Sequence, residues 1–296
     1  MEKDRYEELK IAERGAIVSI VAYIFLAIFK IAIGTLANSS SLAADGLNNF
    51  TDIIGSCAVL IGLRLARRPA DSDHVYGHWK IENIASMITS FIMLLVGLSV
   101  LNEAITKLIH GTYERPDILA ASVGIISAIV MFGVYLYNTR LAKKVNSQAL
   151  AAAAKDNLSD LASSIGTTVA ILATSFHLYF VDSLAAAIIG ALILKTAYDI
   201  FKDSAFSLSD GFDDDLIEEY EKVLLTIKEI KKIRSMRGRT YGANIFLDVV
   251  VEMDPSLTVL QSHYVTEIIE KRLKSEFGVF DVDVHVEPYD AYSDFK

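Results

Sequence analysis

Four polar side chains that could hold a metal ion occur in stretches that are otherwise apolar. Asp45 and Asn49 lie in "AADGLNNFTD", and Asp156 and Asp160 lie in "KDNLSD". Each pair has the i, i+4 spacing that places two residues on one face of a helix. Three carboxylates and an amide oxygen are donors that suit a hard divalent cation. The spacing therefore predicts a metal site between two helices.

Carboxylates at this spacing also favour coupling to protons. In a low dielectric, neighbouring carboxylates cannot all stay ionised without a metal ion, so some of them bind protons. A metal ion then binds only by displacing those protons. Exposed alternately to the two sides of a membrane, such a site would exchange cations for protons, and Asp52 could add a further oxygen. The alternative is an inert polar crevice in which these side chains bond to one another.

The elements that must position these residues are long apolar segments. Hydrophobic residues make up 52% of the 296-residue chain. They cluster in six spans of about 19 to 28 residues, enough to cross a hydrocarbon core of about 30 Å. The spans are 16–37, 41–66, 84–105, 118–139, 149–176 and 183–201. We expect a polytopic helical membrane protein with six transmembrane helices, and we regard a soluble helical bundle as the alternative.

Basic residues near the ends of the spans predict the orientation in the membrane. Lys and Arg concentrate before the first span and in the links between spans two and three and between spans four and five. The opposite links, "NSS", "HGTYERPD" and "HLYFVD", contain Arg115 as their only Lys or Arg. By the positive-inside rule, both termini face the cytoplasm. The net charge of −9 argues against nucleic-acid binding.

Two lysines within the spans are expected to lie at the membrane boundary. Lys30 and Lys195 each stand alone towards the end of a span, where a long side chain can extend its ammonium group to the interface. Cys57 is the only cysteine, so no internal disulfide can form, and its thiol is expected to serve packing.

The chain beyond the last span has the composition of a small soluble domain. A helix is expected over 216–228 and another over 258–277, with strands near 233–239, in "GANIFLDVVVEMDP" and in "FDVDVHVEP". Ile245, Leu247, Val249 and Val251 alternate and should face the core. We therefore predict a transmembrane domain over 1–208 and a cytoplasmic α+β ferredoxin-like domain over 209–296. A domain this small is marginal alone, which favours pairing with a second copy.

Two further groups of residues could bind metal outside the membrane. Asp71, His74 and His78 lie in "RRPADSDHVYGHWKIEN", and the two histidines would share a face if this segment were helical, although Gly77 opposes a helix. In the tail, His285 and Glu287 share the polar face of the last strand, with His263 in the preceding helix. For both groups, the alternative is a solvated surface without metal.

Taken together, these motifs resemble those of the cation diffusion facilitators over nearly the whole chain. The six spans, "AADGLNNFTD", the histidine-containing loop, "KDNLSD", "SLSDG" and the α-β-β-α-β tail occur in the order and spacing of that family. The resemblance implies a homodimeric exchanger in a cell membrane that moves a divalent metal out of the cytoplasm against protons. It implies no enzymatic activity and no cofactor besides the transported metal.

The resemblance also implies roles for particular residues. Asp45, Asn49, Asp156 and Asp160 would form the transport site, and the loop site would bind metal near the dimer interface. A contact between Lys80 and Asp210 would join the two domains. The compact length favours a bacterial protein.

Two departures from the family's zinc transporters concern the metal. Zinc-transporting members usually have histidine where Asp156 stands and aspartate where Asn49 stands. Tail positions that carry histidines in some members are Arg234 and Val250 here, which puts a complete tail site in doubt. Carboxylate and carbonyl oxygens suit Mn²⁺ better than the nitrogen and sulfur ligands that zinc favours.

We therefore expect proton-coupled Mn²⁺ export, as in the manganese-exporting branch that "DGLNN" and "DNLSD" resemble. Zn²⁺ or Fe²⁺ efflux is the alternative within the family. An intramembrane aspartyl hydrolase is the alternative from another class, but its usual Gly-x-Gly-Asp sequence is absent. A passive channel would need a continuous polar pore, which polar stripes on two spans do not supply.

Overall fold

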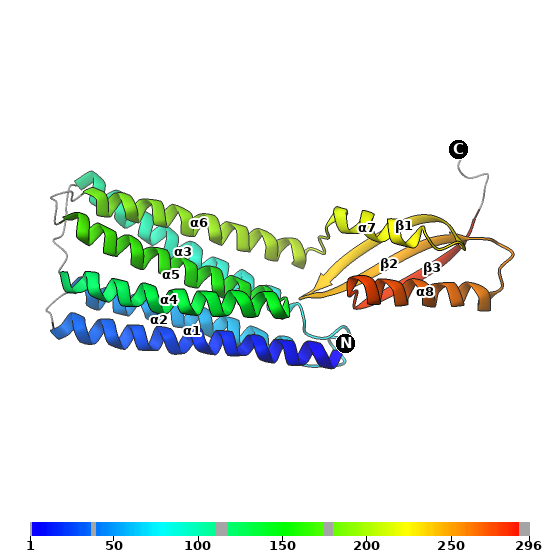
Figure 1. Ribbon diagram of the computed structural model, residues 1–296, viewed down its shortest axis with the longest axis horizontal. Helices are drawn as coiled ribbons and strands as arrows, with labels where there is room; N and C mark the ends of the chain where they lie inside the picture. The colour runs from blue at the N-terminus through cyan, green and yellow to red at the C-terminus, as the bar shows by residue number, and fades with distance from the viewer. Residues whose placement is uncertain (1, 37–39, 111–117, 175–179, 290–296) are drawn as a thin grey trace. The chain divides into compact units, whose positions relative to one another are not determined.

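The computed structural model describes residues 2–36, 40–110, 118–174 and 180–289. Within these ranges the chain forms two compact units, Glu2–Ala205 and the segment from Phe206 onward. The first holds six long helices, and the second holds two helices and a three-stranded sheet (Figure 1). The predicted arrangement, a domain of long helices followed by a small α+β domain, is confirmed. The predicted contact between Lys80 and Asp210 would join the two units, and it stays a prediction.

The helical unit packs its helices side by side. α1 contacts α2 and α4, and α5 contacts α4, α3 and α2. Met93 of α3, Ala152 of α5 and Ile193 of α6 share one buried cluster, which brings the sixth helix against the third and fifth. The helices are α1 Glu2–Leu36, α2 Ser40–Ala66, α3 Ile81–His110, α4 Ile118–Val145, α5 Gln148–Thr174 and α6 Phe180–Leu208.

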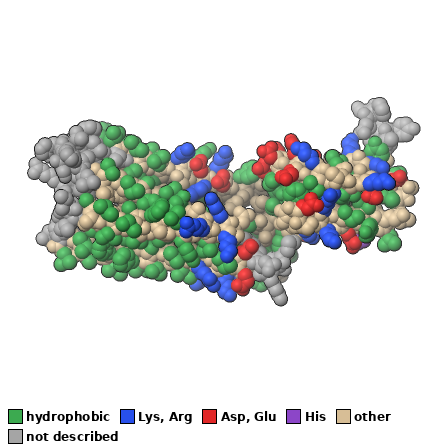
Figure 2. Space-filling view, in the orientation of Figure 1, with side chains coloured by type: hydrophobic (Ala, Val, Ile, Leu, Met, Phe, Trp, Pro, Cys, Tyr) green, Lys and Arg blue, Asp and Glu red, His purple; other side chains and the backbone are tan. Residues whose placement is uncertain are grey.

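The outer surface of this unit is apolar. Val21 and Ile28 of α1, for example, are 61% and 64% exposed, and Figure 2 shows apolar side chains covering most of the visible face of the helices. Within the described residues, three helices are long and apolar enough to cross a membrane: Tyr6–Leu36, Ile81–His110 and Ala121–Val145. Such a surface suits contact with lipid. α2 and α5 carry the polar residues of the predicted site.

The second unit is a two-layer α/β domain. Its sheet has the order β1-β2-β3, with β1 antiparallel and β3 parallel to β2. Leu247, Val249 and Val251 are at most 1% exposed and pack against the helices, as the alternation predicted. The elements are α7 Asp214–Leu224, β1 Ile230–Tyr241, β2 Asn244–Met253, α8 Val259–Phe277 and β3 Asp281–Pro288.

Local sequence determines where α8 begins and ends. The backbone amide of Thr258 donates to Oε1 of Gln261 at 2.8 Å, and the amide of Gln261 donates to the Thr258 hydroxyl at 3.3 Å, which is a capping box. At the other end, Gly278 adopts a φ of 69°, a left-handed conformation that glycine tolerates without strain. These signals define the two ends of α8, and β3 begins three residues after Gly278, at Asp281.

Candidate metal sites

A small cavity lies among the helices of the first unit. Its volume is about 20 Å³, room for roughly one water or ion. The polar side chains that line it belong to three helices: Asp52 of α2, Thr89 of α3, and Asp156, Ser159 and Asp160 of α5. All of them offer oxygen atoms. Two of the predicted carboxylates therefore meet at one cavity, and Asp52 joins them there.

Helix geometry explains part of this lining. Asp156, Ser159 and Asp160 follow at i, i+3 and i+4, so one face of α5 presents all three. Sequence reasoning missed Ser159 and Thr89. The i, i+3 spacing of Asp156 and Ser159 could have indicated that Ser159 shares the cavity face of α5. No sequence pattern indicated Thr89. Its hydroxyl donates to the carbonyl of Ala85 at 3.0 Å, which is ordinary for a threonine in an apolar helix.

The other half of the predicted site lies on α2. Asn49 is 5% exposed, and its Oδ1 accepts a hydrogen bond from Nζ of Lys30 at 3.1 Å. Asn49 precedes Asp52 by three residues but does not itself line the cavity. Asp45 lies in the first half of α2, and its side chain falls outside those that the structure describes.

The ammonium group of Lys30 does not extend outward from the helical unit, so the predicted extension to the interface was wrong. Its side chain is 5% exposed and points between α1 and α2. The reason is that Asn49, on the neighbouring helix, offers an acceptor inside the unit. A buried ammonium group with a hydrogen-bond partner is far less costly than one without. Lys195 of α6 is exposed, as expected.

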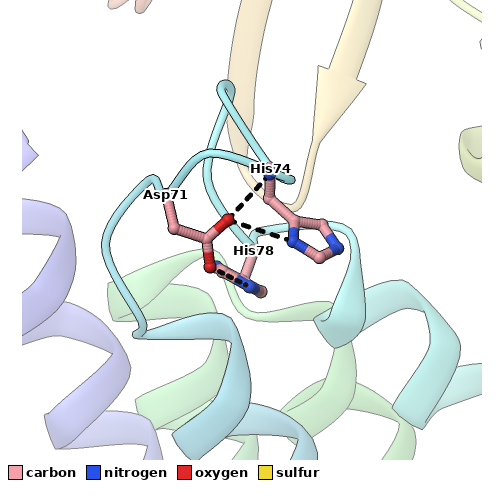
Figure 3. A group of neighbouring side chains, drawn as sticks. All are labelled: Asp71, His74 and His78. Atoms are coloured by element: carbon pink, nitrogen blue, oxygen red, sulfur yellow. Dashed lines mark hydrogen bonds and ion pairs between the residues drawn. The ribbon is translucent and has the colours of Figure 1, made fainter.

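The loop between α2 and α3 brings Asp71, His74 and His78 together (Figure 3). Nδ1 of His74 lies 3.3 Å from Oδ1 of Asp71, and Nε2 of His78 lies 3.5 Å from Oδ2. The ligand atoms of these three residues all lie within 4.8 Å of one another, close enough to share one ion. Among the described ranges, this is the place where at least three His, Cys, Asp or Glu side chains come so close. The group offers two nitrogen donors and one carboxylate to a cation.

A turn, and not a helix, assembles this cluster. The backbone amide of His74 donates to Oδ1 of Asp71 at 2.8 Å, and Gly77 adopts a φ of 81°. The helical i, i+4 arrangement considered for the histidines is therefore wrong. That amide bond is the main reason why the pKa of the Asp71 carboxyl lies below its ordinary value of 3.8. His78 is 8% exposed, and among the residues that the structure describes its Nδ1 has no hydrogen-bond partner.

The tail residues do not form a comparable group. His263 lies 3.6 Å from Glu267, four residues on, and His285 lies 3.9 Å from Glu287. Glu287 in turn accepts a hydrogen bond from Arg234. The described part of the chain therefore shows separate ion pairs at these positions, with Glu287 already paired to a cation.

Comparison with known proteins decides the family. The family model described as "Cation efflux transmembrane domain" matches residues 16–209, and that described as "Cation efflux protein, cytoplasmic domain" matches residues 212–289. The chain belongs to the cation efflux family. This membership confirms the resemblance to the cation diffusion facilitators. Members of this family are multi-pass membrane transporters rather than enzymes, so the aspartyl hydrolase is excluded.

Three relatives from Bacillus subtilis match nearly the whole chain. Manganese efflux system protein MneS is 49% identical, covering 96% of this chain and 98% of the relative. Uncharacterized transporter YdbO is 45% identical, covering 97% and 99%. Manganese efflux system protein MneP is 32% identical, covering 96% and 98%. Cation efflux is therefore the activity of the family to which this chain belongs.

Proposed function

We propose that this chain exports Mn²⁺ from the cytoplasm in exchange for protons. The observation that carries the proposal is the cavity whose polar lining consists of oxygen donors alone, from Asp52, Thr89, Asp156, Ser159 and Asp160. Carboxylate and hydroxyl oxygens suit Mn²⁺, whereas zinc favours nitrogen and sulfur. The manganese efflux named in two relatives supports the same metal.

Proton exchange follows from crowding of the carboxylates. Asp52, Asp156 and Asp160 line the same small cavity, and in the absence of metal their charges repel one another in a poorly solvated space. Protons relieve this repulsion when the cavity is empty. Mn²⁺ arriving from the cytoplasm displaces them, and protons from the other side displace Mn²⁺ in turn. Transport thus requires that the cavity opens to one side at a time.

We further propose that the chain works as a homodimer with both termini in the cytoplasm. The family model of the tail domain and the small size of that domain support pairing. The distribution of basic residues supports the orientation, because Lys and Arg gather towards one end of the helical unit (Figure 2). Asp71, His74 and His78 would bind metal at that end, and Asp45 and Asn49 would complete the transport site.

Zn²⁺ or Fe²⁺ efflux is the second candidate, and one observation favours it. The loop cluster combines two imidazole groups with a carboxylate, a donor set that suits zinc. The two candidates differ in which site selects the cargo. If the oxygen-lined cavity selects it, Mn²⁺ is transported faster than Zn²⁺. If the loop cluster selects it, Zn²⁺ is preferred.

The decisive experiment is metal uptake by purified protein in liposomes. With the lumen acidic, we expect rapid Mn²⁺ uptake, slower Zn²⁺ uptake, and loss of both when a protonophore collapses the pH gradient. Uptake that follows the Mn²⁺ gradient alone would indicate a passive pathway and reject exchange. Faster uptake of Zn²⁺ than Mn²⁺ would reject the manganese assignment.

Asp160→Ala tests the site within the same assay. The variant removes a proposed ligand, so we expect Mn²⁺ uptake to be abolished while the protein stays folded. Asp199→Ala is the matched control, because Asp199 lies on α6, is exposed and does not line the cavity. Wild-type uptake in the Asp160→Ala variant would exclude Asp160 as a ligand.

A further inference from the structure

Buried polar side chains form a series of hydrogen bonds that ends at Asp160. Ser19 and Tyr23 of α1, Asn138 of α4 and Asn157 of α5 are all 0% exposed. Nδ2 of Asn138 donates to Oδ1 of Asn157 at 2.8 Å and to Oγ of Ser19 at 2.7 Å. Nδ2 of Asn157 donates to the hydroxyl oxygen of Tyr23 at 2.9 Å, and Tyr23 donates to Oδ2 of Asp160.

The donor properties of these groups determine the direction of the series. Oδ1 of Asn157 also accepts from the Ser19 hydroxyl at 3.3 Å, so Nδ2 is the atom that faces Tyr23. An amide nitrogen only donates, and the Tyr23 oxygen must therefore accept that bond. Its single hydrogen is then left for Asp160, whose ionised carboxylate only accepts. The series delivers one donor to one oxygen of Asp160.

The Tyr23 hydroxyl is held in place by packing as well. Its ring lies in a buried cluster with Leu26, Met131 and Leu161, contributed by α1, α4 and α5. A ring packed on several sides holds its hydroxyl beside Asp160, because moving it away would disturb three helices. The bond to Asp160 is therefore prearranged before any metal arrives.

We propose that Tyr23 is a positioning residue for metal transport, holding one carboxylate oxygen of Asp160 so that the other is offered to the cation. This inference rests on the proposed function, in which Asp160 is a ligand of the transported metal. Asp160 lines the cavity together with Asp52 and Asp156. With Oδ2 engaged by Tyr23, Asp160 enters that cavity as a ligand with a single oxygen.

A single-oxygen ligand affects both affinity and choice of metal. An oriented carboxylate loses less freedom when the cation binds, so binding is tighter. Ca²⁺ commonly takes both oxygens of one carboxylate and accepts six to eight ligands. Removing the Tyr23 hydroxyl would free Oδ2 for such two-oxygen binding, and Ca²⁺ should then compete better with Mn²⁺.

Tyr23→Phe tests the proposal because it removes the hydroxyl and keeps the ring. In the liposome assay we expect the Mn²⁺ concentration for half-maximal uptake to rise about tenfold or more, as for loss of a hydrogen bond to a charged group. The maximal rate should change far less, and inhibition of Mn²⁺ uptake by Ca²⁺ should increase. Tyr137→Phe is the matched control, since Tyr137 lies on α4 and is 41% exposed.

The outcomes separate this inference from the proposed function. If wild-type protein takes up Mn²⁺ and Tyr23→Phe matches it in half-maximal concentration and Ca²⁺ inhibition, the positioning role is wrong. A fall in maximal rate alone would indicate a merely structural role and would also overturn it. If wild-type protein takes up no metal, the proposed function is rejected. Mn²⁺ binding to purified protein then decides the inference, with about tenfold weaker binding expected for Tyr23→Phe.

A second variant covers the case in which Tyr23→Phe does not fold. Asn157→Ala leaves Tyr23 in place but removes the donor that orients its hydroxyl. We expect the half-maximal Mn²⁺ concentration to rise in this variant too, but by less than in Tyr23→Phe. Thermal unfolding in detergent checks that the variant is folded. An unchanged half-maximal concentration in folded Asn157→Ala protein would overturn the proposal.

Discussion

The ammonium group of Lys30 in α1 donates a hydrogen bond to Oδ1 of Asn49 in α2, across 3.1 Å. Both side chains are 5% exposed. Asn49 lies one helical turn before Asp52, which lines the oxygen-rich cavity. A positive charge at this position repels an arriving cation and partly offsets the charge of the carboxylates when the cavity is empty.

Removing this charge should strengthen metal binding. For Lys30→Met we expect the half-maximal Mn²⁺ concentration to fall about threefold or more, because repulsion of the cation is lost in a poorly solvated region. The maximal rate should fall as well, since the ion leaves more slowly. Lys195→Met, at an exposed position on α6, is the control for loss of a lysine. Weaker Mn²⁺ binding in Lys30→Met would mean that Lys30 serves mainly to hold Asn49 in place.

A single nitrogen ligand should change the selectivity of the cavity. Asp156→His replaces a carboxylate by imidazole, which suits Zn²⁺ far better than Mn²⁺, and it also removes a negative charge. For Mn²⁺ both effects lower binding, whereas for Zn²⁺ they oppose each other. We expect the ratio of Zn²⁺ to Mn²⁺ uptake to rise about tenfold or more, which requires about 1.4 kcal/mol of differential binding. An equal loss for both metals, as in Asp156→Ala, would show that Asp156 does not select the metal.

The loop cluster gives a prediction on pH. The pKa of the Asp71 carboxyl is lowered, chiefly by the backbone amide of His74. The ionised carboxylate therefore stabilises the turn fully at a pH above 3.8, the ordinary pKa of an aspartate. This stabilisation is lost only as the pH falls through the lowered pKa. Between about pH 5 and 8, Asp71 therefore stays ionised. Zn²⁺ binding to the loop should weaken on acidification because imidazole must be free of protons to bind metal.

Asp71→Asn separates these contributions. We expect weaker Zn²⁺ binding throughout pH 5 to 8, because the variant removes one ligand oxygen and its negative charge. Binding to purified protein is measured by competition with a chromogenic chelator, and the double variant His74→Ala, His78→Ala defines the background. Zn²⁺ binding as tight in Asp71→Asn as in wild-type protein would show that Asp71 is not a ligand.

Close packing of α2 on α3 depends on Gly62. A Cβ added there would lie 2.3 Å from Cβ of Ala85, an atom that cannot move without its backbone. Gly62→Ala should therefore destabilise the helical unit by about 1–3 kcal/mol, outweighing the gain of about 1 kcal/mol in helix propensity. Gly133→Ala on α4 is the control, because no atom of the described residues lies within 4 Å of its added Cβ. Thermal unfolding in detergent measures both, and a Gly62→Ala protein as stable as Gly133→Ala would contradict the close approach.

Sequence alone determined the features that depend on short-range geometry. The i, i+4 spacing of Asp156 and Asp160 places both on one face of α5, whatever packs against it. The alternation of Leu247, Val249 and Val251 likewise assigns the buried face of β2. For Asp71, His74 and His78 the residue types indicated a cluster, but the helix considered for them was wrong, because Gly77 and the Asp71 carboxylate form a turn.

Only the tertiary structure decided which polar groups meet across helices. Tyr23 and Asp160 are 137 residues apart, and Lys30 and Asn49 lie on helices whose mutual rotation no local pattern determines. From the sequence, a lysine near the end of an apolar span could place its ammonium group at the membrane interface or bond to a buried acceptor. Which of the two occurs depends on whether the neighbouring helix places an acceptor beside the lysine. Helix packing determines this, because a buried polar group is stable only where its partner already lies within hydrogen-bond distance.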